Sequence, residues 1–264
     1  MPEAQSEGVR IDYADLGKGE PALLLLPGWC ATRSAFAKMI DLCAAHRRVL
    51  ALDWRGHGSS GAPTADFGTP ALVEDALAVI NASGVTQVAP VALSHAGWVG
   101  IELRRRLAEL VPKLALIDWI VLDLPTPFLS VLRALQDPIH WEETRKNLFS
   151  AWLQGISNPE LSSFVLNDMG AFGFDMWARA GREIMAAYTQ HGNPLRTLEA
   201  LAPAVPTLHI YAQPSDPVYW QAQQSFSASH PWFTARRVNA LSHFPMFEEP
   251  EEMAQEIGRF LSAS

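Results

Sequence analysis

The sequence predicts an α/β fold in which helices pack on a mostly parallel sheet. Three observations carry this prediction. Short aliphatic runs alternate with helical patterns along the chain, as they do in βαβ units. The 264 residues, 48% of them hydrophobic, are enough for one large core. Only the stretch 124–196 departs from the alternation, because it shows helical periodicity and no strand-like run.

The strands are expected at short apolar runs bounded by turn residues. Their ranges are 9–15, 22–26, 48–53, 87–93, 114–119, 207–212 and 234–239. The first alternates apolar with polar residues, so we expect an antiparallel strand at the edge of the sheet. The later runs are apolar throughout, which is typical of parallel strands covered on both faces. Apolar residues recur at helical spacing between them, and a last helix is expected over 250–261.

The helical stretch divides the chain into a first core part, 1–123, a cap, 124–196, and a second core part, 197–264. Trp152 and Trp177 occupy apolar positions of the cap. An insertion after the strand 114–119 lies over the carboxyl edge of the sheet, where open α/β sheets bind their ligands. We therefore expect the functional site between the cap and that edge.

Composition excludes several classes of protein. Lys and Arg number 20 against 28 Asp and Glu, a net charge of −8. Apart from the arginines at 104–106 and 236–237 the positive residues are scattered, so neither a nucleic-acid nor a membrane partner is expected. The only cysteines are Cys30 and Cys43, and the polar, acidic residues 1–7 do not resemble a signal peptide, so we expect a reducing, cytoplasmic location. The longest apolar run, 22–26, is too short to cross a bilayer.

Ser94 lies at the corner between a predicted strand and a predicted helix, in the segment 91–98. A nucleophile elbow places a serine at such a corner, with small residues two positions before and after because strand and helix nearly touch there. Ala92 and Ala96 fill these two positions. The alternative is an ordinary N-cap serine.

His243 follows the last predicted strand and precedes the final helix, which is the position of the last member of a Ser, Asp, His series in this kind of fold. The acid has two candidates. Asp216 follows the expected strand 207–212, and Asp118 ends the strand 114–119 between bulky apolar residues that would bury it. A buried carboxylate needs a partner, which His243 could supply, whereas Asp216 could equally be a turn residue. The residues alone leave both open.

The loop 27–30 follows an early strand, where a backbone N–H can form one half of an oxyanion hole. The residue after the elbow serine, His95, would supply the other half. Trp29 would then place a large aromatic surface beside the reacting centre, unless it packs in the core.

Two short motifs suggest other chemistry and fit it poorly. Residues 56–61 match the G-x-G-x-x-G pattern of dinucleotide-binding proteins, but Pro63 and a loop follow where a helix should begin. His140 and Glu142 have the spacing that begins a facial iron triad, yet they lie inside the helical cap. The sequence predicts no metal site.

Several segments together resemble the cofactor-independent 3-hydroxy-4-oxoquinoline 2,4-dioxygenases of the α/β-hydrolase superfamily. These segments are 27–30, 94–99, 117–119, Trp152, 230–233 and 243–245. The resemblance extends over the whole chain and is carried by their joint order. It implies an α/β-hydrolase fold, with a mostly parallel eight-stranded sheet and a helical cap inserted after the sixth strand.

The resemblance also implies a reaction without metal or organic cofactor. His243 would be the general base, paired with Asp118 rather than Asp216, and Ser94 would donate or accept a hydrogen bond instead of attacking. The substrate, 3-hydroxy-4-oxoquinoline, would react with O2 to give N-formylanthranilate and carbon monoxide. Its contacts would come from Trp29, Cys30, Ala31, Leu93, Ser94 and Trp152, with Trp29 and His95 forming the oxyanion or dioxygen pocket. Ala31 departs from the family, because a relative can carry a histidine there.

Two other functions remain as alternatives. The order of Ser94, an aspartate and His243 is also that of a serine hydrolase acting on an ester or a carbon–carbon bond, with Ser94 as nucleophile. A relative that binds aromatic ligands without turning them over is the other possibility. The sequence does not distinguish a 2-unsubstituted ring from a 2-methyl ring, nor does it give the oligomeric state.

Overall fold

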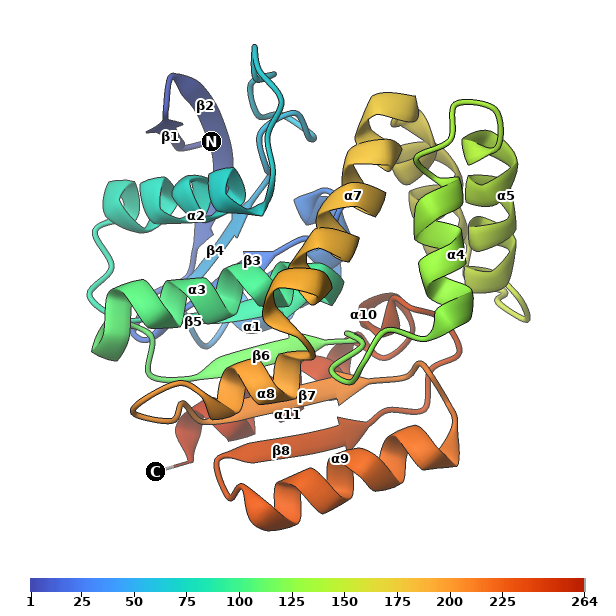
Figure 1. Cartoon of the computed structure of the whole chain (residues 1–264). Helices are drawn as coiled ribbons and strands as arrows, with labels where there is room; N and C mark the ends of the chain where they lie inside the picture. Colours follow the sequence, from blue (N-terminus) through green and yellow to red (C-terminus); the bar gives the residue numbers. More distant parts are fainter. Residues whose placement is uncertain (264) are drawn as a thin grey trace.

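The computed structural model describes residues 1–263, which form one eight-stranded sheet with helices on both faces (Figure 1). The strand order is β1-β2-β4-β3-β5-β6-β7-β8, and β3 to β8 run parallel to one another. The strands are β1 (Glu3–Ser6), β2 (Val9–Leu16), β3 (Ala22–Leu26), β4 (Val49–Leu52), β5 (Val88–Leu93), β6 (Leu114–Ile117), β7 (Thr207–Tyr211) and β8 (Phe233–Arg237). The predicted fold class is therefore confirmed.

The antiparallel end of the sheet differs from the prediction in one respect. The strand expected at the edge, β2, is antiparallel to β4, but β1 covers its outer side. The prediction of an edge position for β2 is thus wrong. The strand β1 has no apolar run, because only Ala4 and Ser6 face inward. Glu7 and Gly8 connect β1 to β2 with positive φ at both positions, as in a type I′ hairpin turn.

The helices form two layers around the sheet and a separate group above it. Their bounds are α1 (Ala37–Ala44), α2 (Thr69–Ser83), α3 (Gly97–Leu107), α4 (Thr126–Ala134), α5 (Trp141–Trp152), α6 (Pro159–Ser163), α7 (Phe174–His191), α8 (Pro194–Glu199), α9 (Pro217–Ser229), α10 (Pro245–Glu248) and α11 (Pro250–Ser262). Short turns of other helix types are η1 (Arg33–Phe36), η2 (Ser94–Ala96), η3 (Ala108–Leu110), η4 (Phe164–Asp168) and η5 (Met169–Ala171). No helix in residues 1–263 combines the length and apolar content needed to span a membrane.

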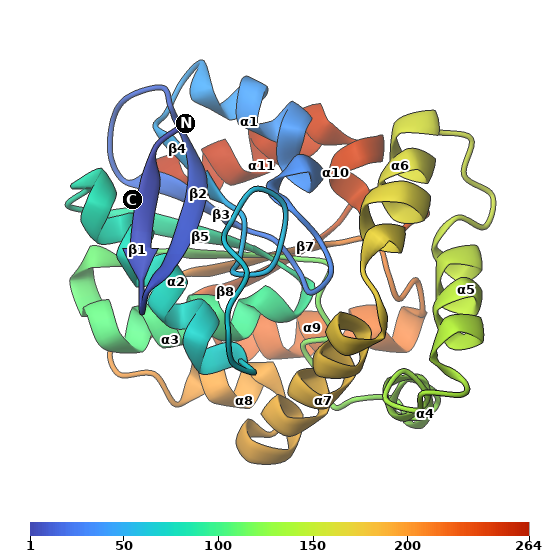
Figure 2. The same cartoon turned by 90° about the horizontal axis from the view of Figure 1, so that it is seen from above.

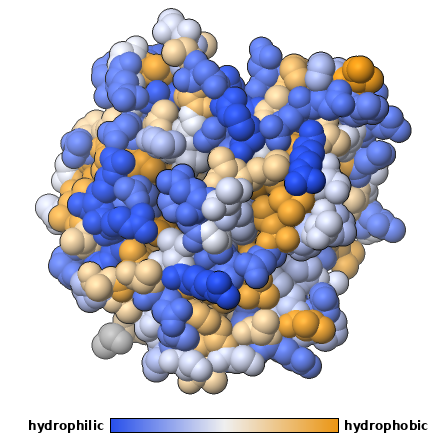
Figure 3. Space-filling model, in the orientation of Figure 1, coloured by the Kyte–Doolittle hydropathy of each residue, from blue (hydrophilic) through white to orange (hydrophobic). Residues whose placement is uncertain are grey.

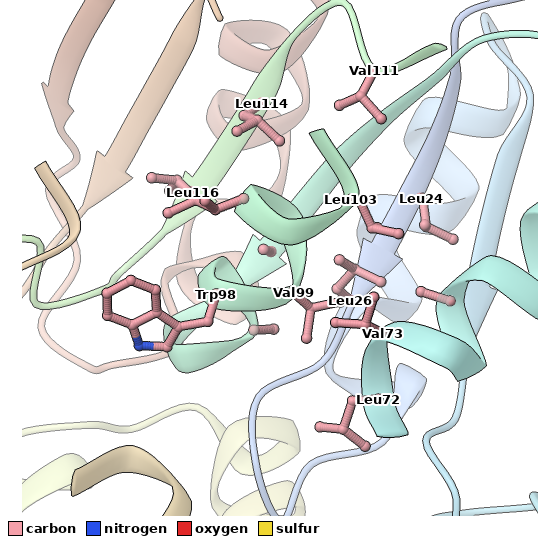
Figure 4. Close-up of a cluster of buried hydrophobic side chains, with 14 of the residues drawn as sticks. Leu24, Leu26, Leu72, Val73, Trp98, Val99, Leu103, Val111, Leu114 and Leu116 are labelled. Atoms are coloured by element: carbon pink, nitrogen blue, oxygen red, sulfur yellow. The ribbon is translucent and has the colours of Figure 1, made fainter. Parts of the chain in front are cut away.

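Two hydrophobic clusters, one on each face, hold the layers to the sheet. Helices α1 and α11 cover one face, while α2, α3, α8 and α9 cover the other (Figure 2). The strand β3 illustrates how both faces of the sheet are buried from solvent. Leu24 and Leu26 point to one cluster, and Leu23 and Leu25 point to the other. Figure 4 shows the first cluster, in which β3 and β6 pack against α2 and α3.

Helices α4 to α7 follow β6 in the chain and stand beyond the carboxyl ends of the parallel strands (Figure 1). We call these four helices the cap. Its longest helix, α7, packs along α4 and also contacts α5. Helix α8 returns to the core, because Leu195 and Leu198 join the cluster beside α3. On the face drawn in Figure 3, hydrophobic residues reach the surface between α4 and α7.

Candidate active site

A cavity of about 510 Å³ lies between the cap and the carboxyl edge of the sheet. Ser94, Asp118 and His243 line it from the sheet side. Apolar side chains line it from the cap, namely Leu132 of α4, Leu148 and Trp152 of α5, and Trp177, Ala180 and Ile184 of α7. A cavity of this size and lining is typical of a site for a small, mostly apolar ligand.

Ser94 occupies the turn from β5 into η2 and adopts φ of 54°, a left-handed conformation that is strained for a serine. Ala92 and Ala96 are buried on either side of it. The loop that carries Gly28 passes close by, since a Cβ added to Gly28 would lie 3.6 Å from the Cβ of Ser94. The turn has the local geometry of an elbow that lifts a side chain above the sheet edge.

Asp118 follows β6 and also has positive φ, 44°. Its side chain is completely buried, and the backbone N–H of Gln213 donates to its Oδ1 at 2.9 Å. Its other oxygen, Oδ2, lies 3.6 Å from Nδ1 of His243 and has no hydrogen-bond partner within residues 1–263. The carboxylate is therefore oriented by a backbone donor on one side and faces the imidazole on the other.

His243 lies in the loop between β8 and α10, with 21% of its side chain exposed. The indole of Trp152, the last residue of α5, stacks on it with ring centroids 5.4 Å apart and planes 20° apart. Phe244, which is buried, packs edge-on against both rings. The imidazole is thus fixed between a carboxylate and an aromatic wall, while part of it remains open to the cavity.

His95 also lines the cavity, and its ring is buried. The indole N–H of Trp119 donates to Nδ1 of His95 at 3.2 Å, so the proton of the neutral imidazole is on Nε2. Burial, followed by the nearby His243, lowers the pKa of His95 to about 3. Gly97 makes this pairing possible, because a Cβ there would lie only 2.2 Å from the Trp119 ring.

Of the three candidate substrate contacts in the loop after β3, two reach the cavity and one does not. Trp29 and Ala31 line the cavity, as does Leu93 at the end of β5. Cys30 does not: with φ of 58° its side chain turns into the core cluster that contains Phe36, and it is completely buried. Burial raises the pKa of its thiol well above the ordinary value. The structure therefore does not bring Cys30 to the cavity.

Asp216, the second candidate for the acid, lies elsewhere. Its carboxylate accepts the N–H of Val218 at 2.8 Å and caps the N-terminus of α9. It is exposed and does not line the cavity. Of the two aspartates, only Asp118 lies next to His243.

The two motifs that suggest other chemistry have structural explanations. Gly58 adopts φ of 49°, and a Cβ there would lie 2.3 Å from the Asp53 carboxylate, so this glycine makes room for an internal carboxylate. His140 is exposed and pairs with Asp137 at 2.8 Å. Within residues 1–263, no three His, Cys, Asp or Glu side chains are grouped so that they could hold a metal ion.

Sequence reasoning missed most of the cap wall and Gln213. Trp177, Ala180 and Ile184 recur at helical spacing, which predicts one apolar face of α7. Their spacing alone does not indicate whether that face covers the core or a cavity. Gln213 lines the cavity and bonds to Asp118 through its backbone N–H, a contact that carries no side-chain signature.

Comparisons with known proteins agree on one group of relatives. A family model described as the alpha/beta hydrolase family matches residues 23–256. The chain is 37% identical to 2-heptyl-3-hydroxy-4-quinolone dioxygenase AqdC2 of Rhodococcus erythropolis over 262 residues, 97% of each protein. It is 35% identical to 1H-3-hydroxy-4-oxoquinoline 2,4-dioxygenase of Pseudomonas putida over 265 residues, which cover 100% of both.

The similarity extends to three dimensions. A solved structure of an AqdC variant in complex with its substrate, the Pseudomonas quinolone signal, superimposes with a TM-score of 0.95 at 35% identity. The match covers 100% of this chain and 99% of that one. The cap and the sheet therefore have the same arrangement in both proteins.

Proposed function

The chain belongs to the α/β-hydrolase family and, within it, to the 3-hydroxy-4-quinolone dioxygenases, and we propose how its cavity performs their ring cleavage. The substrate is a 3-hydroxy-4-oxoquinoline, and both atoms of O2 enter the product. The observation that carries this proposal is the pairing of the buried Asp118 with His243 at the polar end of a mostly apolar cavity.

His243 takes the proton from the 3-hydroxyl group of the substrate. Its Nδ1 faces Asp118, which leaves Nε2 as the nitrogen available to the cavity. The buried carboxylate stabilises the imidazolium that forms, because opposite charges attract strongly where water is excluded. An enol of this kind is more acidic than a serine hydroxyl, so a paired imidazole is a sufficient base.

The substrate anion is then electron-rich enough to react with O2 at C2. The resulting peroxide attacks the C4 carbonyl, and the cyclic intermediate breaks its O–O bond and both bonds to C3, which leaves as carbon monoxide. With an unsubstituted ring the product is N-formylanthranilate. Negative charge on the ring oxygens is held by the backbone N–H groups of Trp29 and His95 and by the hydroxyl of Ser94, all from cavity-lining residues. No step calls for a metal or an organic cofactor.

The shape of the cavity favours a ring that carries an alkyl chain at C2. The polar groups lie at the sheet edge, where the hydroxyl and carbonyl of the ring can pair with them. The cap side offers mostly carbon surface, from residues such as Leu132, Leu148 and Ile184, and Gln154 is its polar exception. An unsubstituted ring held at the sheet edge leaves this surface without a partner, whereas an alkyl chain buries it.

Gas exchange tests the proposed reaction. Protein treated with a chelator is mixed with 3-hydroxy-4-oxoquinoline or its 2-heptyl derivative, and O2 uptake and carbon monoxide release are followed together. We expect equal amounts of the two gases and a faster reaction with the alkylated ring. A folded sample that consumes no O2 with either compound would overturn the proposal.

A further inference from the structure

The two partners of the proposed base come from separate loops. Asp118 follows β6, whereas His243 lies more than a hundred residues later in the loop before α10. Neither loop is part of regular structure at these positions, and loops are the more mobile parts of a fold. A general base works only if its geometry is held closely. Some other contact must therefore join the two loops.

Gln213 makes that contact with two different groups. Its backbone N–H donates to Oδ1 of Asp118 at 2.9 Å, and its side-chain Nε2 donates to the carbonyl oxygen of Leu241 at 2.9 Å. Leu241 lies two residues before His243. Gln213 follows β7, the parallel neighbour of β6, so the sheet itself places it beside Asp118. One residue thus connects the acid to the loop of the base.

The far side of the His243 loop is held by Glu248 of α10. Its carboxylate accepts the N–H of Leu241 at 3.1 Å and the N–H of Ser242 at 2.9 Å. The Ser242 hydroxyl donates to the same carboxylate and accepts the N–H of Phe244 at 3.0 Å. Leu241 is 61% exposed, so hydrogen bonds to its backbone, more than its packing, fix this residue.

From these contacts we infer that Gln213 is a positioning residue: its amide bond to Leu241 sets the distance between His243 and Asp118. The inference rests on the proposed role of His243 as base. The carboxylate of Glu248 bonds the loop to α10. The side chain of Gln213 bonds the loop to the segment after β7, and the backbone N–H of the same residue bonds to Asp118. Without the amide bond, the loop keeps its anchor at Glu248 and loses its link to β7. The pair then samples longer separations, and the bound substrate loses its proton less completely.

The experiment compares Gln213→Met with Gln213→Ala in the full-length protein. Methionine keeps the length and bulk of the side chain without the donor, and both variants keep the backbone N–H that bonds to Asp118. Gln221→Met is the matched control, because Gln221 is an exposed glutamine of α9 outside the cavity. Substrate is bound without O2, and the absorbance band of its anion gives the ratio of ionised to neutral substrate. Steady-state kinetics then give kcat and KM.

We expect both Gln213 variants to shift that ratio about tenfold toward neutral substrate and to lower kcat by a similar factor, with KM within about twofold. The control should match the unmodified protein. An unchanged ratio in Gln213→Met, or a change in KM alone, would overturn the inference. If the unmodified protein itself fails to ionise the substrate, the proposed function fails instead, so the two failures are distinguishable.

Discussion

The two ends of the cavity are built in different ways. At the sheet end, polar groups are placed by the backbone: Ser94 and Asp118 both have positive φ directly after adjacent strands, and His243 is fixed by stacking on Trp152. At the cap end, apolar side chains from three helices form the wall without a hydrogen-bonding pattern of their own. If the proposed mechanism holds, the reaction depends on a few oriented atoms at the sheet end, whereas substrate choice depends on the shape of the cap wall.

Removing the base should produce the largest effect. His243→Ala is expected to lower kcat/KM by about a hundred- to ten-thousand-fold, because it removes general-base catalysis. Ser94→Ala should keep substantial activity, since a hydrogen-bonding serine contributes only part of the stabilisation of the anion. The rates of O2 uptake by the two variants provide the measurement. Equal and complete losses in both would instead indicate a serine nucleophile, because triad members act as a unit.

Asp118→Asn should have the next largest effect. The amide keeps the shape of the side chain but removes the charge that stabilises protonated His243, so kcat should fall by roughly a hundredfold. Affinity for the substrate should change little, since Asp118 pairs with His243 and Gln213. The measurement is kcat and KM beside Asp216→Asn as control. A comparable loss in that control would contradict the choice between the two acids.

At the cap end, kcat/KM should depend on the size of the substrate's C2 substituent and of the side chains that form the wall. Each methylene added at C2 of the substrate should raise kcat/KM about fourfold until the wall is filled, which corresponds to about 0.8 kcal/mol of buried surface. Ala180→Phe should remove this gain while leaving the unsubstituted ring a substrate. Ala186→Phe, on the exposed side of the same helix, is the control. If the rate does not depend on chain length, the alkyl chain does not bind at the cap.

Three buried histidines should make the protein less stable in acid, and only one of them, His95, lines the cavity. Burial lowers the pKa of His57, His95 and His209 to about 4, 3 and 4, against 6.5 when unfolded. Below pH 6.5 the unfolded chain therefore binds protons that the folded chain does not. Each buried histidine should reduce the free energy of unfolding by about 1.4 kcal/mol per pH unit from there down toward pH 4.

Denaturant unfolding at pH 7.5 and pH 5.5 measures this loss. His209→Gln should reduce the pH dependence, whereas Gln221→Met, at an exposed position of α9 without a titratable group, should leave it unchanged. A free energy of unfolding that stays constant between the two pH values would show that the buried histidines are not kept neutral.

The sequence predicted the sheet end of the cavity far better than the cap end. Parallel strands end at one edge, so the serine after β5 and the histidine after β8 were expected to meet there, and they lie together. The strand pattern left Asp118 and Asp216 open as the acid, and only the family resemblance chose Asp118. The orientation of Cys30 could not be predicted, because one positive φ decides which way that loop turns its side chains. The residues of the cap wall could not be predicted either, because helical periodicity shows that a helix face is buried but not what it covers.

Isotope labelling tests the central claim most directly, because it follows the atoms through the reaction. The reaction is run with oxygen-18 gas in ordinary water, and the product and the released gas are analysed by mass spectrometry. The mechanism requires one labelled atom in the amide carbonyl and one in the carboxylate of the product, with unlabelled carbon monoxide carrying the 3-oxygen of the substrate. Product oxygen that comes from water would contradict direct reaction of the substrate anion with O2 and would favour hydrolysis through Ser94.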